Sequence, residues 1–249
     1  MASTSETGHA KNVANFESLI SFCTGDGPAY NPTNANIKIP SMTALLTSSR
    51  SALQTVKTTK TTFDNASNSR EIGFDPFKKL STRIINALEA TNAAKQTIDD
   101  AKTINRKIQG KRAGGKSDPP APPVIPDPAP SPEDNQISVS QQSFDSLIDN
   151  FSKLIVSVTA EPLYAPNEND LKISALNTSL TNLKALNTAV INAATPYSNA
   201  RIARNIILYQ PGTGLVEVAG EAKKYVKSVF GATSPQYKQI SALQFKKVK

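Results

Sequence analysis

The chain has 249 residues but no tryptophan, a single histidine (His9) and a single cysteine (Cys23). One cysteine excludes an intramolecular disulfide, and one histidine with one cysteine cannot build a His/Cys zinc site within a single chain. A catalytic Ser/His/acid or Cys/His arrangement would depend on His9, which lies in a polar N-terminal stretch. We therefore expect no catalytic residues, no metal site and no cofactor, and predict that the protein is not an enzyme.

Long apolar runs are also missing from the sequence. No stretch approaches the roughly 18 consecutive apolar residues of a membrane-spanning helix. The N-terminal residues lack the basic segment followed by an apolar core that marks a signal peptide. These absences predict a cytoplasmic protein, and they leave export by a route without a signal peptide open.

Positive charge exceeds negative charge, with a net charge of +8 and a hydrophobic content of 38%. The excess is spread over both halves of the chain. It permits contact with nucleic acid, anionic lipid or an acidic protein, and it selects none of them. Alanine, serine, threonine and asparagine are abundant, which is typical of thin helices with short side chains.

The most informative feature present is an internal repeat. Residues 144–148 (FDSLI) resemble residues 16–20 (FESLI), and each copy continues with a tyrosine, a proline two residues later and a Lys-Ile pair. Aligned on the tyrosines, the copies share the pairs Tyr30/Tyr164, Pro32/Pro166, Lys38/Lys172, Ile39/Ile173, Leu46/Leu180, Thr47/Thr181, Val56/Val190, Asn65/Asn199, Ala66/Ala200, Arg70/Arg204 and Ile72/Ile206. We interpret the repeat as one structural unit used twice.

The copies predict an all-α fold, an elongated helical bundle of two tandem three-helix repeats. Residues 1–112 form the first repeat and residues 137–249 the second, and the Pro-rich segment 113–136 is a semi-rigid linker between them. The linker is long enough to run back along a bundle, so one merged bundle and two separate bundles both stay open. The merged form is favoured because three thin helices bury little surface alone.

The long middle helix of each repeat has the clearest pattern. Apolar residues recur at steps of three and four, as in packed helices. Pro166 and Asn167 predict its start in the second copy, and Pro196 predicts an end or a kink near Thr195. The seam positions are Met42, Leu46, Ser49, Leu53, Val56, Lys60 and Phe63 in the first copy, and Leu176, Leu180, Leu183, Val190, Ala194 and Tyr197 in the second, where Asn187 interrupts the seam.

The third helix differs between the copies. In the first copy it is expected to begin at Asp75-Pro76, with aspartate as the N-cap, and to continue through Ile108. In the second copy it covers Val218 to Val229 and breaks between Gly231 and Pro235, before a short tail from Gln236.

Residues 110–117 match the P-loop pattern G-x-x-x-x-G-K-[ST]. A P-loop needs a strand before it and a helix after it, so that backbone N–H groups can surround the phosphates. Here a helical pattern precedes the motif, and Asp118, Pro119 and Pro120 follow it. We interpret the match as a helix end that runs into the linker.

Two groups of residues are candidates for interaction. The first comprises the loop tyrosines Tyr30 and Tyr164, which we expect to fold back on the bundle and hydrogen-bond through their hydroxyls; a ligand or partner site on the loops is the alternative. The second comprises basic residues at the ends of the repeats, which complement helix C-termini and could also contact anionic lipid or nucleic acid. These are Arg106, Lys107, Lys111, Arg112 and Lys116, then Lys246, Lys247 and Lys249.

Charge is scarce on the second long helix, where Lys184 is the only charged residue between Lys172 and Arg201. Small polar side chains on outer faces suit close packing against further helices. The leading hypothesis is a structural or interaction protein that binds itself, as a homo-oligomer or filament, or binds a protein partner. A membrane-active helical bundle and a basic nucleic-acid-binding protein are the alternatives.

Overall fold

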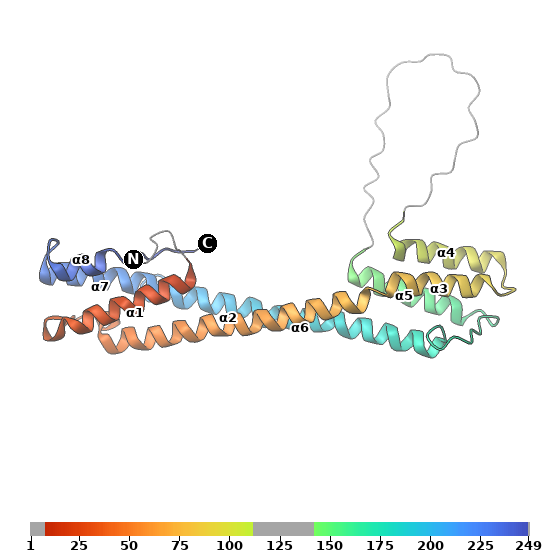
Figure 1. Ribbon diagram of the computed structural model, residues 1–249, viewed down its shortest axis with the longest axis horizontal. Helices are drawn as coiled ribbons and strands as arrows, with labels where there is room; N and C mark the ends of the chain where they lie inside the picture. The colour runs from red at the N-terminus through yellow and green to blue at the C-terminus, as the bar shows by residue number, and fades with distance from the viewer. Residues whose placement is uncertain (1–7, 112–141, 249) are drawn as a thin grey trace, which may run out of the picture. The chain divides into compact units, whose positions relative to one another are not determined.

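The computed structural model describes residues 8–111 and 142–248 (Figure 1). These residues form helices and no β-strand, which confirms the all-α prediction. The linker 113–136, Arg112 and Lys249 lie outside the described residues. The α-helices are α1 (His9–Gly25), α2 (Ile39–Phe74), α3 (Phe77–Glu89), α4 (Lys95–Gln109), α5 (Phe144–Thr159), α6 (Ile173–Tyr209), α7 (Leu215–Phe230) and α8 (Pro235–Ser241), and the short 3-10 helices are η1 (Gly27–Ala29) and η2 (Ala35–Ile37).

Helix α6 differs from its prediction at both ends. It begins at Ile173 instead of near Pro166, and it continues through Pro196 to Tyr209. Pro196 removes one backbone donor, yet packing holds the residues around it in place. Ala193 and Ala200 are buried, and the ring of Tyr197 stacks on Phe63 of α2 with the centroids 5.8 Å apart.

The predicted third helix of the first copy is two helices, α3 and α4. Thr91 ends the first of them: its hydroxyl donates to the carbonyl of Leu88 at 2.7 Å and accepts from the N–H of Ala93 at 3.1 Å. The Asp75 cap was also predicted wrongly, because α3 begins after Pro76 with no side-chain capping bond. The break lets α4 pack against α3 and α5 and bury Ile108. In the second copy α7 ends at Phe230, at the predicted break, and the stretch from Gln236 that was expected as a tail belongs to the short helix α8.

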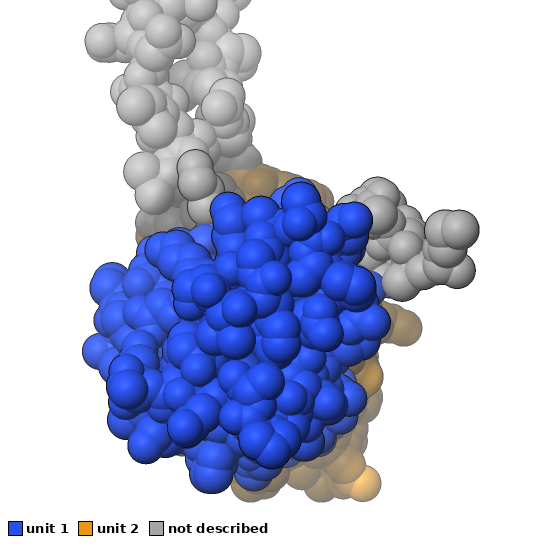
Figure 2. Space-filling view, turned by 90° about the vertical axis from the view of Figure 1, so that its left-hand side faces the viewer, with its two compact units in different colours: residues 1–65, 191–249 blue, residues 66–190 orange. Residues whose placement is uncertain are grey.

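The described chain divides into two compact units, coloured in Figure 2. Unit 1 comprises residues 1–65 and 191–249, and unit 2 comprises residues 66–190. Neither unit coincides with residues 1–112 or 137–249, so the division into two three-helix repeats stays a prediction from the sequence.

The core of unit 1 combines the two ends of the chain. Helix α1 contacts both α7 and α8, and α7 also contacts α8. Phe16 and Leu19 of α1 are fully buried together with Leu215 and Val226 of α7. The remaining buried members are Val13, Ile20, Cys23, Tyr30, Ile37, Met42, Leu46, Leu208, Tyr209, Val218, Ala219, Ala222 and Ile240.

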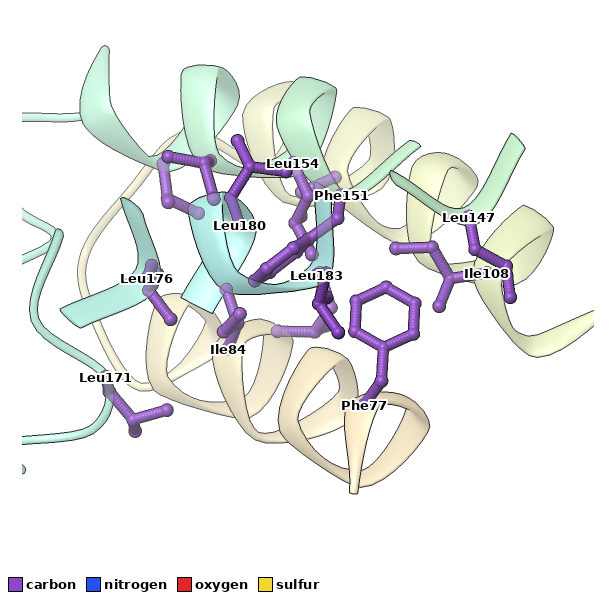
Figure 3. Packing of buried hydrophobic residues seen from close by; sticks show 14 of the residues in the cluster. Phe77, Ile84, Ile108, Leu147, Phe151, Leu154, Leu171, Leu176, Leu180 and Leu183 are labelled. Carbon is purple, nitrogen blue, oxygen red and sulfur yellow. The ribbon is translucent and has the colours of Figure 1, made fainter. Parts of the chain in front are cut away.

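The core of unit 2 is shown in Figure 3. It joins α3 and α4 of the first sequence copy to α5 and the start of α6 of the second copy. Phe77 and Phe151 meet edge to face with the centroids 5.0 Å apart. Ile84, Ile108, Leu147, Leu154, Leu171, Leu176, Leu180 and Leu183 surround them. Each core is therefore built from both halves of the chain.

The two units share one plan, which identifies equivalent positions. Equivalent buried residues are Phe16/Phe151, Leu19/Leu154, Ile20/Ile155, Tyr30/Tyr164, Ile37/Leu171, Met42/Leu176, Leu46/Leu180, Phe74/Leu208, Ser81/Leu215, Ile84/Val218, Ile85/Ala219 and Leu88/Ala222. Residues 144–148 are therefore not structurally equivalent to residues 16–20, and that part of the sequence alignment is wrong. Phe144 is only partly buried, and the residue that plays the part of Phe16 is Phe151, about two helical turns later.

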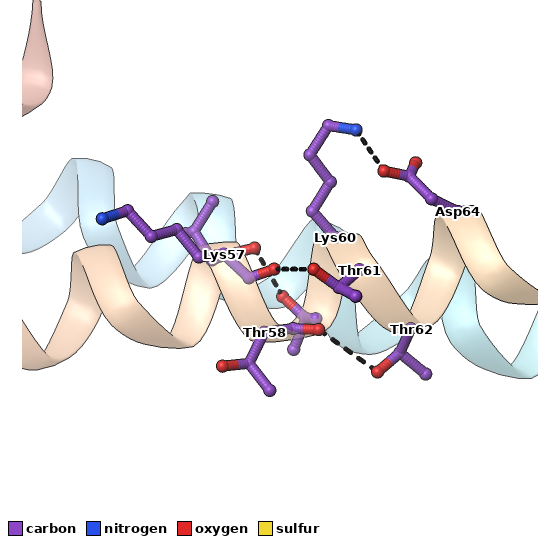
Figure 4. A network of polar contacts seen from close by, with 8 residues as sticks. Lys57, Thr58, Lys60, Thr61, Thr62 and Asp64 are labelled. Carbon is purple, nitrogen blue, oxygen red and sulfur yellow. Dashed lines mark hydrogen bonds and ion pairs between the residues drawn. The ribbon is translucent and has the colours of Figure 1, made fainter.

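A polar stretch of α2 is shown in Figure 4. Its threonine hydroxyls donate to carbonyls one turn earlier, for example Thr61 to Lys57 at 3.1 Å and Thr62 to Thr58 at 3.2 Å. Lys60 forms an ion pair with Asp64 on the same helix. Such hydroxyls are satisfied within their own helix.

Candidate functional site

The two repeated tyrosines hold their loops in the same way. The Tyr30 hydroxyl donates to the carbonyl of Ile37 at 2.7 Å, and the Tyr164 hydroxyl donates to the carbonyl of Leu171 at 3.1 Å. Both side chains are buried. Burial raises the pKa of Tyr164 to about 12 and raises the pKa of Tyr30 further, so both hydroxyls keep their protons at neutral pH. The expected structural role of these tyrosines is confirmed.

In unit 1 a third tyrosine closes the loop onto α7. The Tyr225 ring meets the Tyr30 ring edge to face with the centroids 5.2 Å apart. Its hydroxyl accepts a hydrogen bond of 3.1 Å from the backbone N–H of Asn31. The side chain of Asn34 donates to Glu221 at 3.0 Å. Helix α7 thus binds the loop through an aromatic contact and two hydrogen bonds.

In unit 2 the equivalent surface is an open cavity of about 580 Å³ between α3 and the loop that follows Tyr164. At its edge Arg83 of α3 forms a two-point ion pair with Asp170, in which Nη2 lies 3.1 Å from Oδ1. Leu163 is half exposed at the cavity. The lining residues are Arg83, Asn86, Ala87, Ala90, Thr91, Leu163, Ala165, Pro166, Asn167, Glu168 and Leu171.

The ion pair at the edge of the cavity determines the charge state of Asp170. The hydrogen bond from Arg83 lowers the pKa of Asp170, so the carboxylate stays ionised at neutral pH. The rest of the lining is apolar apart from the amides of Asn86 and Asn167, the Thr91 hydroxyl and the Glu168 carboxylate, a combination typical of sites that bind a ring and orient it through a few polar groups. In residues 8–111 and 142–248, no three potential metal ligands among His, Cys, Asp and Glu lie together. The sequence identified Tyr164 here but not Arg83 or Thr91.

The basic residues of the first repeat lie in unit 2 at the end of α4. Arg106 and Lys107 are in its last turn, and Lys111 is exposed just beyond it. Gly110 has the left-handed conformation of a C-cap (φ 71°), and the N–H of Lys111 donates to the carbonyl of Arg106 at 3.0 Å. The first glycine of the P-loop match is therefore a helix cap; residues 112–117 lie outside the described residues.

The basic residues of the second repeat lie in unit 1 on the C-terminal segment. The Asn12 side chain binds both backbone groups of Lys246: it donates to the carbonyl at 2.7 Å and accepts from the N–H at 3.1 Å. The side chains of Lys246 and Lys247 are exposed. Whether either basic group binds a partner stays a prediction.

A second candidate surface lies on α6 in unit 1 and was not identified from the sequence. Ile191, Ile202 and Ile206 share one face at 3.6 residues per turn, and they are 58%, 56% and 51% exposed. Ile202 and Ile206 also line a shallow groove of about 410 Å³ with Lys247 and Val248. We call these three isoleucines the α6 face. The shared pair Ile72/Ile206 is the signal that could have revealed it, since Ile72 is exposed in unit 2 as well.

Comparison of the chain with protein-family models, curated proteins and solved structures returned no match. Among the helices that the structure describes, none has the length and apolar character needed to cross a membrane. The two candidate surfaces therefore rest on the geometry of this chain alone.

Proposed function

We propose that the protein is a non-enzymatic structural protein that self-assembles through the α6 face. The observation that carries the proposal is the exposure of Ile191, Ile202 and Ile206 on one side of a single helix. Burying an isoleucine side chain contributes about 1.5–3 kcal/mol, and an aligned row of them is a common basis of protein interfaces.

A second copy of this chain can pack on the α6 face in spite of the positive net charge. With a net charge of +8, two copies repel one another over most of their surfaces. Between Ile191 and Ile202 the α6 face carries the small, neutral side chains of Thr195 and Ser198, and the positive charge beside it comes from Arg201 and from Lys247 of the adjoining groove. The α6 face is thus a place where two copies can approach closely.

The proposal extends the architecture expected from the sequence. The two tandem repeats are expected to form an elongated helical bundle. In the cytoplasm this bundle would serve as the repeating building block of an assembly. Both a closed homo-oligomer and a filament are compatible with it, and the geometry of the contact decides between them.

Sedimentation velocity over a range of concentrations tests the proposal. The wild type is expected to self-associate, and the Ile202→Ser/Ile206→Ser variant to weaken the association at least tenfold. The matched control is Val156→Ser on α5, which changes an exposed apolar residue of unit 2 and should leave the association unchanged. A wild type that stays monomeric at the highest concentration, or a double variant that associates like the wild type, contradicts the proposal.

The same proteins distinguish the alternative functions. Leakage of anionic liposomes caused by the wild type and abolished in the double variant would assign the α6 face to a membrane instead of a second copy. A gel shift with nucleic acid that weakens steeply with salt would assign function to the basic groups.

A further inference from the structure

We propose that the open cavity of unit 2 binds a phenol ring, as the tyrosine side chain of a partner polypeptide or as a free phenolic molecule. The argument comes from the molecule itself: the equivalent place in unit 1 is occupied by such a ring, that of Tyr225.

The equivalence of the two places rests on the buried residues around them. Tyr30 and Tyr164 anchor the loops identically, through bonds to Ile37 and Leu171. Helices α3 and α7 supply the other wall, and their buried faces fix how they correspond: Ser81, Ile84, Ile85 and Leu88 stand at the positions of Leu215, Val218, Ala219 and Ala222. When the same correspondence is continued along the chain, Thr91 is equivalent to Tyr225 and Ala87 is equivalent to Glu221.

The difference between the units arises where the helices end. Helix α7 continues to Phe230, so Tyr225 is carried on a helix and reaches the loop. Helix α3 ends at Glu89, and the Thr91 hydroxyl is committed to the turn through Leu88 and Ala93. Among the described residues of unit 2, none that lines this place carries an aromatic ring, and the result is the cavity of about 580 Å³. Ligand sites commonly measure ~300–1,000 Å³.

The lining of the cavity suits a phenol. Apolar atoms of Ala87, Ala90 and Leu163 can contact the ring, and the Arg83 guanidinium at the edge favours an aromatic face. The loop N–H equivalent to that of Asn31 is already used, since Ala165 donates to the carbonyl of Leu163 at 3.0 Å. The phenol hydroxyl is therefore expected to bond to polar side chains of the lining, with Asn86 and Glu168 as candidates.

Titration of the full-length protein, labelled at its methyl groups, followed by NMR tests this inference. N-acetyltyrosinamide at millimolar concentration should shift the methyl signals of Leu163, Leu171, Ala87 and Ala90. The phenylalanine analogue should bind about fivefold more weakly, because it lacks the hydroxyl and one hydrogen bond is worth about 1 kcal/mol. No shift at these methyls, or equal binding of both analogues, would overturn the proposal.

Two variants locate the site. Ala87→Phe fills the cavity from α3 and should abolish the shifts, whereas Thr82→Phe places the same ring at an exposed position of α3 outside the lining and should preserve them. The reciprocal variant Tyr225→Thr opens the equivalent place in unit 1 and should create a second binding site with its own shifts near Tyr30. Retained binding in Ala87→Phe contradicts the assignment even if Tyr225→Thr fails to fold.

Two further ligands distinguish a tyrosine of a partner polypeptide from a free phenolic molecule. Tighter binding of a short tyrosine-containing peptide than of N-acetyltyrosinamide supports a polypeptide partner. Tighter binding of p-cresol than of the peptide supports a free phenolic ligand.

Discussion

The hydroxyl of Tyr30 donates a hydrogen bond of 2.7 Å to the carbonyl of Ile37, seven residues further along the chain. The equivalent bond from Tyr164 to Leu171 fixes the second loop. Each bond joins two buried groups, so the carbonyl would have no access to water if the hydroxyl were removed.

Replacing Tyr164 by phenylalanine is therefore expected to lower the free energy of unfolding by about 1–3 kcal/mol. Tyr30→Phe should behave alike, because its environment is equivalent. Urea denaturation followed by circular dichroism measures the effect, with Tyr237→Phe as a control at a less buried tyrosine. Unchanged midpoints for both loop variants would show that the hydroxyls contribute nothing to stability.

His9 gives the fold a dependence on acid pH. Its Nδ1 lies 2.7 Å from the hydroxyl of Tyr209, and its pKa is lowered by burial first and by the nearby charge of Arg204 second. Since the folded state holds a proton less readily than the unfolded state, stability is complete above pH 6.5 and falls as pH drops through the lowered pKa. The urea midpoint should decrease between pH 7.5 and pH 5.5, and His9→Gln should reduce that decrease. A variant with the same pH dependence as the wild type would exclude His9 as its source.

Asn187 is a buried polar residue in the α6 seam. It accepts a hydrogen bond from Arg70 at 3.0 Å and donates one to Asp145 at 2.7 Å. Asn187→Leu completes the apolar seam, yet it should destabilise the protein by about 1–3 kcal/mol because Arg70 and Asp145 lose these bonds. Denaturation of this variant beside the exposed control Thr188→Leu separates the effect from a general effect of leucine. A more stable Asn187→Leu would contradict the importance of this network.

Pro196 is exposed within α6 and breaks its backbone ladder. Pro196→Ala should raise the free energy of unfolding, by up to about 3 kcal/mol, since alanine restores a backbone donor without disturbing a buried contact. Thermal unfolding measures the gain. A loss of stability would mean that packing around Tyr197 and Phe63 requires the proline.

Much of the fold follows from the sequence. The steps of three and four predicted the buried seam at Met42, Leu46, Leu176, Leu180 and Leu183, because helices bury one face. The recurrence of Tyr30 and Tyr164 at the same offset from the long helices also predicted that their hydroxyls form hydrogen bonds. The helical spacing of apolar residues in both copies was sufficient for the all-α class.

Other features depend on long-range contacts that local patterns do not contain. Residues 90–94 contain no glycine or proline, so the local sequence did not predict the break between α3 and α4. The break is stabilised by the packing of α4 against α5. The similarity of residues 16–20 to residues 144–148 was misleading, because the pattern of buried residues, and not the local identity of the amino acids, defines which positions are equivalent. The cavity could not be predicted, because it depends on how α3 and a distant loop pack, and the α6 face left only the shared pair Ile72/Ile206 as a signal, since an exposed isoleucine and a buried one look alike in a sequence.

The central structural claim is that each core is built from both halves of the chain. A site-specific protease sequence inserted within residues 113–136 would separate the halves covalently. After cleavage, the two fragments are expected to co-elute as a 1:1 complex in size-exclusion chromatography and to separate only in denaturant, because each core contains helices of both. Fragments that elute apart under native conditions, each with a folded helical spectrum, would contradict the account.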